Sequence, residues 1–350
     1  MEKKLSPRRD GAIDLVKALA ICAVLCIHCS ANHFANYPVG SLRWLATDFF
    51  GSVSRWAVPA FLLCSGALMN DPDRDVSIKK LFSRYLLRLA AALGAWAVFY
   101  ELLRLFFSRG SAPVGQLLLQ AGKNLLYGNT YYHLYYFYFV FALYLALPLT
   151  RLVVRCASPS ELRYIVGLWL LLGGVLRFLQ FFWPFSQMYA SLLYLVMPAA
   201  FLCPGLGLLG WYLRQHPPKD WIAPLLTFLA GFAVTFLGTW RRSAQAGELD
   251  QFYLDGFSLF ILVMAVGVFR LSQWWGLRWG ETPKAVRFLS AASFCVYLVH
   301  PFFQALAVPS RFLALPVWLA VPAQAAVLLS LSLAAYWVLR RLPVVGRWLI

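Results

Sequence analysis

The sequence predicts an all-α fold, a multi-pass transmembrane helical bundle, from two observations. The 350 residues are 61% hydrophobic and 13% charged, with a mean hydropathy of +0.67, whereas soluble domains are about 45–50% apolar and about 25% charged. Apolar runs of about 20 residues, each long enough to cross a bilayer core of roughly 30 Å, recur along the whole chain. These properties exclude a soluble enzyme built around one large core.

About ten spans are expected where apolar runs lie between breaker residues. They cover residues 13–35, 49–69, 85–107, 132–152, 162–180, 191–213, 221–240, 254–272, 288–307 and 315–338. The shorter and more polar segment 113–130 is expected to lie at the external membrane interface as an amphipathic helix. The basic start of the chain precedes a full-length apolar run without a small-residue cleavage site, so the first span is expected to remain attached. Residues 1–350 then form a single integral-membrane domain.

The distribution of positive charge predicts how the bundle is oriented. Of the 31 Lys and Arg residues, 21 lie on the side of the N-terminus and the C-terminal tail, and nine lie on the opposite side. The positive-inside rule therefore places both termini in the cytoplasm. The net charge of +17 is spread over short loops, which indicates membrane lipids and no nucleic acid as partners.

The cysteines invite a metal-site interpretation that the helical geometry does not support. "CIHC" resembles a ligand motif, but Cys22, Cys26 and Cys29 form a stripe turned about 100–160° away from His28 on a helix. Most of the seven cysteines fall within spans, so disulfides are not expected either. We expect these side chains to pack against neighbouring helices, and we assign no metal.

The first span, "AIDLVKALAICAVLCIHCSA", carries three ionisable residues on one face. Lys17 and His28 are separated by about 16 Å of rise and only about 20° of rotation. Asp14 lies one turn before Lys17 and about 40° from His28 on the helical wheel. Charged groups within a span are costly and face a cavity or another polar group. We therefore expect this polar stripe to line a cavity from the cytoplasmic surface to beyond the midplane.

The second span contains one arginine and a small polar pair. Arg55 in "SRWAVPAFLLCSGALMN" is expected near the external end, with Asp48 or Glu101 as its partner. A positive group there could fix an acceptor or stabilise an oxyanion. Ser65, near the cytoplasmic end, is followed by a glycine, a pair that on its own indicates close helix packing.

The loop "DPDRDVSIKKLFSRYLLR" is the densest cytoplasmic basic cluster. Lys80, Arg84 and Arg88 recur at i, i+4 and i+8, close to Arg74 and Lys79. Taken alone, the cluster favours a topology signal and contact with anionic lipid headgroups. The alternative is a phosphate-binding site at the mouth of the cavity.

Two further histidines lie toward the external side. His133 follows two tyrosines at the start of the fourth span, and His300 lies in "SFCVYLVHPFF" of the ninth. Either one alone is more often structural, but together with His28 they indicate a polar chamber. His33 and His216 are expected to be loop residues without a role.

Four motifs occur in this order: "IDLVKALAICAVLCIH", "SRWAVPAFLLCSGALM", "YYHLYYFYFVFALYLALPL" and "SFCVYLVHP". With them, the chain resembles the acyltransferase-3 family of integral-membrane acyltransferases, which modify bacterial surface glycans. The resemblance extends from the first to the ninth span and is closest to members without an appended external domain. The family more often has Arg at the position of Lys17, which keeps the charge but differs in hydrogen-bonding geometry.

The resemblance implies a membrane-bound acyltransferase of the bacterial cytoplasmic membrane. It would transfer an acyl group, most often acetyl in this family, from cytoplasmic acetyl-CoA or another acyl-CoA to a hydroxyl of an extracytoplasmic glycan or lipid-linked sugar. The implied catalytic residues are His28, Lys17, Asp14 and Arg55. The implied donor-binding residues are Lys17, Lys79, Lys80, Arg84, Arg88 and Ser65. The acceptor would contact His133, Glu101, His300 and Tyr297. Direct transfer and a transient acyl-histidine both stay open.

A transporter of a small solute such as an amino acid is the alternative, because it would also line a cavity with Lys, His and Asp. The two halves of the sequence show no internal symmetry and no paired broken helices, which are typical of transporters built from repeats. A purely structural subunit would leave the polar stripe unexplained.

Overall fold

The computed structural model describes residues 10–108, 113–187, 198–307, 312 and 314–350. Within these ranges the chain is helical and contains no strand, which confirms the predicted all-α class. The first half consists of α1 (Gly11–Ala31), η1 (Phe34–Asn36), α2 (Leu42–Ser54), α3 (Ala57–Met69), α4 (Ile78–Lys80), η2 (Leu81–Leu86), α5 (Leu87–Phe107), α6 (Val114–Tyr127), α7 (Tyr135–Leu145) and α8 (Leu147–Cys156). The second half consists of α9 (Pro159–Leu170), η3 (Leu171–Val175), α10 (Leu176–Leu179), η4 (Phe185–Gln187), α12 (Ala199–Gln215), α13 (Ile222–Ala246), α14 (Leu259–Gly276), α15 (Lys284–Ala307), α16 (Val317–Leu339) and η6 (Val345–Leu349).

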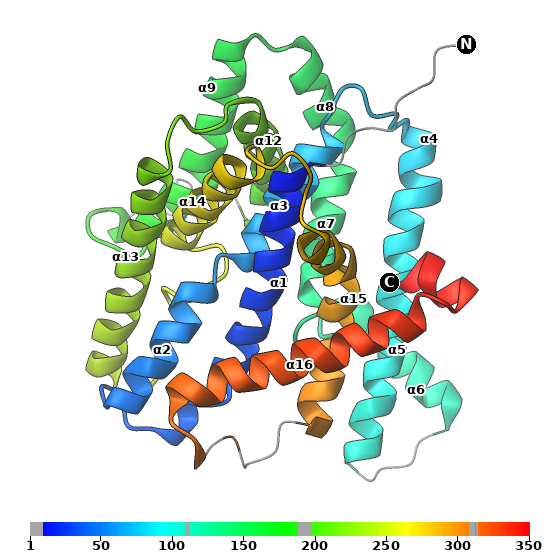
Figure 1. Cartoon of the computed structure of the whole chain (residues 1–350), viewed down its shortest axis with the longest axis vertical. Coiled ribbons are helices and arrows are strands. Elements are labelled where there is room, and N and C mark those ends of the chain that lie inside the picture. Colours follow the sequence, from blue (N-terminus) through cyan, green and yellow to red (C-terminus); the bar gives the residue numbers. More distant parts are fainter. Residues whose placement is uncertain (1–9, 109–112, 188–197, 308–311, 313) are drawn as a thin grey trace.

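α1 runs through the centre of the bundle (Figure 1). It packs against α2, α3, α14, α15 and α16. Small residues such as Ala18, Ala20 and Ala23 are buried against these neighbours, and a helix that is apolar on nearly all sides is buried in this way. The carboxylate of Asp10 starts the helix by accepting hydrogen bonds from the amides of Ala12 and Ile13 at 3.1 and 3.2 Å.

The described residues contain eight helices or helix groups that are long and apolar enough to cross a membrane. The pair α7–α8, bent by 46°, makes a ninth if it is counted as one span. The protein is therefore a multi-pass membrane protein. The remaining predicted span, 191–213, coincides with α12, of which 17 residues are described from Ala199 onward. Residues 191–197 of that prediction lie outside the described residues.

The second span differs from the expected range 49–69. It begins at Leu42 and breaks at Arg55 and Trp56 into α2 and α3. The hydroxyl of Ser41 caps the earlier start by accepting a hydrogen bond from the amide of Trp44 at 3.2 Å. Arg55 consequently lies near the middle of this span and not at its external end.

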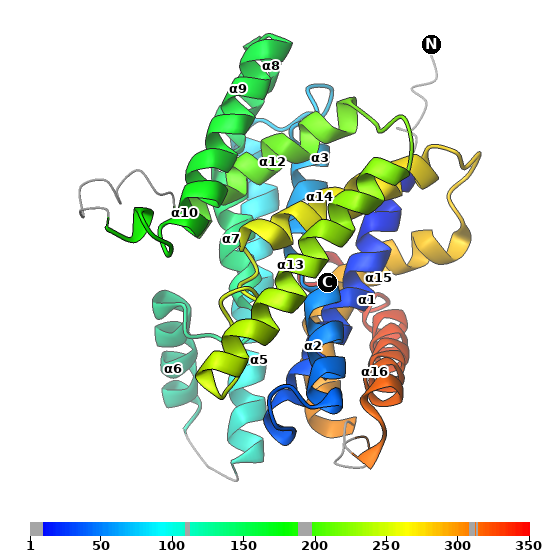
Figure 2. The same cartoon turned by 90° about the vertical axis from the view of Figure 1, so that its left-hand side faces the viewer.

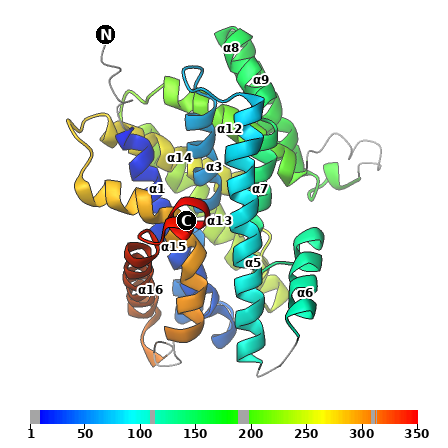
Figure 3. The ribbon, with the colours of Figure 1, turned by 90° about the vertical axis from the view of Figure 1, so that its right-hand side faces the viewer.

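The amphipathic segment 113–130 is confirmed as a helix, α6, which lies beside α5 (Figures 1 and 3). Asn124 of α6 donates a hydrogen bond to Glu101 of α5 at 2.5 Å. Leu118, Leu119 and Leu126 remain exposed on the other face, as expected for a helix at a membrane interface.

α13 and α14 pack along each other, and the chain between them does not stay at the surface (Figure 2). In both Figures 1 and 2 it climbs from the lower end of α13 back to the middle of the molecule, where α14 begins. This connecting segment, residues 247–258, brings polar and aromatic side chains into the bundle.

α3 and α12 approach each other closely through glycine residues. A Cβ atom on Gly66 would lie 2.1 Å from the Cα atom of Gly207, and a Cβ atom on Gly210 would lie 2.1 Å from the carbonyl oxygen of Leu63. Small residues permit this backbone contact between membrane helices. The contact fixes α3, which carries Ser65, against α12.

We predict that Gly66→Ala lowers the stability of the protein by about 1–3 kcal/mol, because the added methyl group meets backbone atoms that cannot turn away. The melting temperature of the detergent-solubilised protein measures this. Gly94→Ala in α5 is the matched control, since its Cβ would meet no atom within 4 Å. Equal melting temperatures for the two variants would contradict the prediction.

Candidate active site

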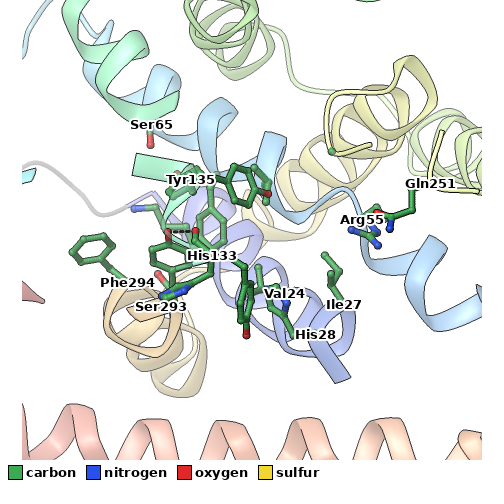
Figure 4. A pocket seen from close by; sticks show the side chains of 17 residues that line it. Val24, Ile27, His28, Arg55, Ser65, His133, Tyr135, Gln251, Ser293 and Phe294 are labelled. Carbon is green, nitrogen blue, oxygen red and sulfur yellow. Dashed lines mark hydrogen bonds between the residues drawn. The ribbon is translucent and has the colours of Figure 1, made fainter. Parts of the chain in front are cut away.

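A cavity of about 470 Å³, here called the inner cavity, lies between α1, α3, α7, α15 and segment 247–258 (Figure 4). It is lined by Lys17, Val24, Ile27, His28, Arg55, Val58, Phe61, Ser65, Tyr132, His133, Tyr135, Tyr136, Gln251, Gly256, Ser293, Phe294 and Tyr297. Four-fifths of the chain length separates Lys17 and Tyr297, the first and last of these residues. The fold therefore assembles the cavity from spans that are distant in the sequence.

Three histidines cluster beside this cavity, and two of them, His28 and His133, line it. The ring of His28 stacks on that of His300 with centroids 5.0 Å apart, and the His133 and His300 centroids are 5.6 Å apart. His133 and His300 are almost fully buried, whereas His28 is partly exposed. His28 is thus the most accessible of the three imidazoles. Among the described residues no group of three or more His, Cys, Asp and Glu side chains has the arrangement of a metal site.

Hydrogen bonds from α15 fix the geometry of the histidine cluster. The Nδ1 atom of His300 lies 3.1 Å from the carbonyl oxygen of Val296, so Nδ1 carries the proton and Nε2 is the unprotonated nitrogen. The Tyr297 hydroxyl donates to the carbonyl of His133 at 2.6 Å, and Gln304 donates to the carbonyl of His28 at 3.0 Å. These bonds satisfy backbone oxygens that lipid could not satisfy.

Arg55 lies in the break between α2 and α3 and lines the inner cavity. Its guanidinium interacts electrostatically with Asp48, Tyr135 and Asp255. Asp48 accepts a hydrogen bond from Ser52 at 2.9 Å, and within the described part of the chain no carboxylate lies within 4 Å of Arg55. Arg55 and Gln251 are drawn on one side of His28 in Figure 4. The guanidinium can therefore donate to an oxygen that enters the cavity.

A second cavity, of about 740 Å³, opens beside the start of α1 and is here called the mouth cavity. Its acidic lining residues are Asp10, Asp14, Asp71 and Asp73, and its basic ones are Lys17, Arg74 and Arg214. Because the numbers of acidic and basic residues nearly balance, the cavity has no broad positive field. The binding of an anion there would therefore depend on contacts with individual basic side chains.

Two arginines hold the rim of the mouth cavity. Arg214 of α12 forms ion pairs with Asp10 and Asp71 at 3.0 and 2.9 Å. Arg151 of α8 is buried and donates to three backbone carbonyls. These belong to Met69 at 2.6 Å, Asp71 at 2.8 Å and Arg74 at 2.6 Å. The planar fork of an arginine suits such multiple contacts. Together the two side chains fix the loop that follows α3.

The polar stripe of α1 lines both cavities, as its helical spacing predicts. Asp14 lies at the mouth cavity and accepts a hydrogen bond from the Ser290 hydroxyl at 2.6 Å. His28 lies at the inner cavity, and Lys17 lines both. Ser293 of α15 also lines both cavities. The two cavities therefore meet at Lys17.

The sequence profile of the acyltransferase-3 family, described as an acyltransferase domain, matches residues 10–341. The chain belongs to the acyltransferase-3 family. Membership makes this protein a membrane acyltransferase, with an acyl donor and an acceptor as its substrates. No curated protein and no solved structure matches the chain at a significant level.

Except for Lys17, the basic residues expected to hold the donor of this acyltransferase lie outside the lining of the two cavities. Lys80 pairs with Asp75 at 3.1 Å, and Arg88 donates to the backbone oxygen of Ile350. Lys79 and Arg84 are exposed. Of the basic cluster at residues 74–88, only Arg74 lines the mouth cavity in the described structure.

Glu101 also lies away from the histidines. It pairs with Arg104 at 2.8 Å, accepts the hydrogen bond from Asn124 of α6, and lines a separate surface pocket. By contrast, Ser65, His133 and Tyr297 line the inner cavity.

Several residues of the site were not predicted from the sequence. They are Arg151, Arg214, Tyr132, Gln251 and Gln304. Arg151 and Arg214 were counted as topology signals at the ends of spans, although an arginine at a helix end can also turn inward. Gln251 falls between the predicted spans 221–240 and 254–272, and the apolar pattern there carries no signal that the chain re-enters the bundle.

The start of segment 247–258 of the acyltransferase is held by an ion pair with Arg242, near the end of α13. Arg242 donates to the carboxylate of Asp250 at 3.0 Å, and this hydrogen bond holds the pKa of Asp250 below its ordinary value. The other carboxylate oxygen accepts from the amide of Phe252 at 2.8 Å. The contact stabilises the segment that carries Gln251 into the cavity.

We predict that Asp250→Asn destabilises the protein at neutral pH by less than about 1 kcal/mol, since the pair is partly solvated. A carboxyl whose pKa is lowered by folding contributes stability above its ordinary pKa, and this contribution is lost as the pH falls through the folded value. The difference in melting temperature between wild type and variant should therefore shrink as the pH falls below about 3.9, the ordinary pKa of an aspartate. Glu248→Gln, in the same segment, is the control, and a pH-independent difference for Asp250→Asn would contradict the prediction.

Proposed function

We propose that this protein transfers an acyl group, acetyl by resemblance, from cytoplasmic acyl-CoA to a hydroxyl of an extracytoplasmic glycan or lipid-linked sugar. In this proposal it works in the bacterial cytoplasmic membrane with both termini in the cytoplasm. The observation that carries the proposal is the meeting of the two cavities at Lys17, with His28 on the far side. A long, narrow donor bound at the mouth cavity could reach His28 by this route.

The donor would bind with its charged end at the mouth cavity and its uncharged arm along α1. Arg74 and Lys17 are the basic side chains that could contact its phosphates there, because Arg214 already neutralises two carboxylates. Ser65 lies further along the inner cavity, where it could contact the arm. If the nucleotide end of the donor extends beyond the mouth cavity, its further proposed contacts are Lys79, Lys80, Arg84 and Arg88.

His28 is proposed as the general base. In its neutral form the imidazole would accept the proton of the sugar hydroxyl as that oxygen attacks the thioester carbonyl. The bond between the carbonyl carbon and sulfur then breaks, and the thiolate of CoA leaves with a proton from the imidazolium. The stacked ring of His300, whose tautomer is fixed by Val296, would keep the His28 ring in place. A transient acyl-His28 fits the same geometry.

Arg55 is proposed to stabilise the oxyanion of the tetrahedral intermediate. A guanidinium without a carboxylate at contact distance can donate fully to a developing negative charge, and in a low-dielectric cavity such a donor is effective. Asp14 would act at a distance, by orienting Lys17 from the preceding turn of α1. His133, Tyr297 and His300 would line the acceptor side.

We predict that His28→Ala lowers the turnover number for acyl transfer by about 10²–10⁴-fold, the usual contribution of a general base. Release of free CoA thiol from acetyl-CoA in the presence of membrane-derived glycan acceptor measures the rate. His216→Ala, at an exposed position outside the cavities, is the matched histidine control. A folded His28→Ala protein that keeps the wild-type rate would refute the proposed role.

We predict that Lys17→Met raises the KM for acetyl-CoA by about tenfold, because a charge-assisted contact contributes about 1.5 kcal/mol or more. Lys17→Arg should keep most of the affinity, since it preserves the charge. Initial rates at varied acetyl-CoA concentration separate KM from turnover number. An unchanged KM in Lys17→Met would show that the donor does not pass Lys17.

A further inference from the structure

A third pocket, of about 160 Å³ and here called the side pocket, lies between α10, segment 247–258 and the start of α14. It is lined in part by Arg177, Phe178, Phe181, Phe252, Asp255 and Ser258. Gln251 lines both this pocket and the inner cavity. The side pocket is therefore a neighbour of the histidine site, although the acyl donor does not pass through it in the proposed reaction.

One part of the side pocket is built from aromatic rings. The Phe252 ring lies 5.7 Å from that of Phe178 and 5.2 Å from that of Phe181, measured between centroids. Arg242 stacks on Phe252, with its guanidinium carbon 4.6 Å from the ring centroid. The faces of aromatic rings carry partial negative charge, which attracts the C–H bonds on the flat face of a sugar ring.

Another part of the side pocket presents a donor and an acceptor side by side. Arg177 and Asp255 lie 3.7 Å apart, which is too long for a direct hydrogen bond. One Asp255 oxygen is held by the amide of Phe257 at 2.8 Å. A pair of neighbouring sugar hydroxyls could donate to Asp255 and accept from Arg177 at once. An arginine within a membrane span is costly and indicates a ligand or a polar path.

Ser258 supplies an independent indication that a ligand binds here. It is the N-cap residue of α14, yet its side chain makes no cap hydrogen bond, although serine at this position ordinarily accepts one from the helix. Ser258 is only 9% exposed, and its Oγ atom has no hydrogen-bond partner among the described residues. Buried hydroxyls are ordinarily paired, so a ligand hydroxyl in the side pocket would complete the arrangement.

We propose that the side pocket is a subsite for one sugar ring of the acceptor, adjacent to the ring whose hydroxyl reacts at His28. This inference rests on the proposed function and adds the position of the acceptor. The ring would stack on Phe178 and Phe252 and exchange hydrogen bonds with Arg177, Asp255 and Ser258. Because Asp255 interacts electrostatically with both Arg177 and Arg55, a ring held here would place the next ring beside Arg55 in the inner cavity.

Photolabelling of the detergent-solubilised full chain tests the location directly. The probes are diazirine-bearing methyl glycosides of glucose, galactose, N-acetylglucosamine and rhamnose, with an octyl diazirine lacking a sugar as the control probe. We expect at least one glycoside, but not the octyl probe, to label peptides 174–181 or 251–259, and excess unlabelled glycoside to abolish the label. Labelling of these peptides by the octyl probe as strongly as by the sugars, or no sugar label there, overturns the proposal.

Kinetics of variants test whether this binding serves the reaction. We expect Asp255→Asn and Ser258→Ala to raise the KM for a glycan acceptor by about tenfold with a smaller change in turnover number. Ser272→Ala is the matched control, because it removes another buried, unpaired hydroxyl from the same helix outside the side pocket. An acceptor KM that Asp255→Asn leaves unchanged, or that Ser272→Ala raises equally, overturns the proposal. Photolabelling requires no acyl transfer, so a sugar label at these peptides would support the subsite even if acyl-CoA proved not to be the donor. Acyl transfer to a glycan without a sugar label at these peptides would overturn the subsite but not the proposed function.

Discussion

A polar stripe on an apolar helix has to be kept away from lipid, and the packing of five helices around α1 satisfies this constraint. Asp14, Lys17 and His28 follow one face of α1, and each lines a cavity. The neighbours then have to supply partners inside the bundle, as Ser290 does for Asp14 and Gln304 for the backbone of His28. The central position of α1 is thus the geometric reason why two cavities exist and why they meet on one helix.

The two cavities separate binding from chemistry. Charged residues of both signs surround the mouth cavity, and Arg151 and Arg214 make its rim rigid. The inner cavity contains aromatic rings, imidazoles and one guanidinium. A charged substrate end is well solvated in the first environment, whereas the second strengthens every hydrogen bond and electrostatic contact made in it. Lys17 stands at the boundary between these environments.

The helical period was sufficient to predict the fold class, most spans and the direction in which the stripe of α1 faces. His28 and Tyr297 lie on strongly apolar helices, whereas His133 lies in the turn just before α7. The period could not predict the break at Arg55, since α2 contains Arg43 and Asp48 and reads as partly polar. Arg151 and Arg214 turn inward only because of tertiary contacts with the loop after α3, which no local pattern records. Arg84 and Arg88, by contrast, follow a regular helical spacing that their exposed position does not connect to a cavity.

The separation of Lys17 and His28 along α1 has an electrical consequence. Eleven residues of helix span about 16 Å, roughly half of a bilayer core of about 30 Å. If the phosphates of the donor stay at the mouth, only the neutral thioester and its uncharged arm occupy this stretch. The membrane potential, which acts on a unit charge with about 2.3 kcal/mol per 100 mV, performs almost no work on an uncharged group. An acyl group carried in this way crosses the insulating part of the membrane without drawing on the ion gradients of the cell.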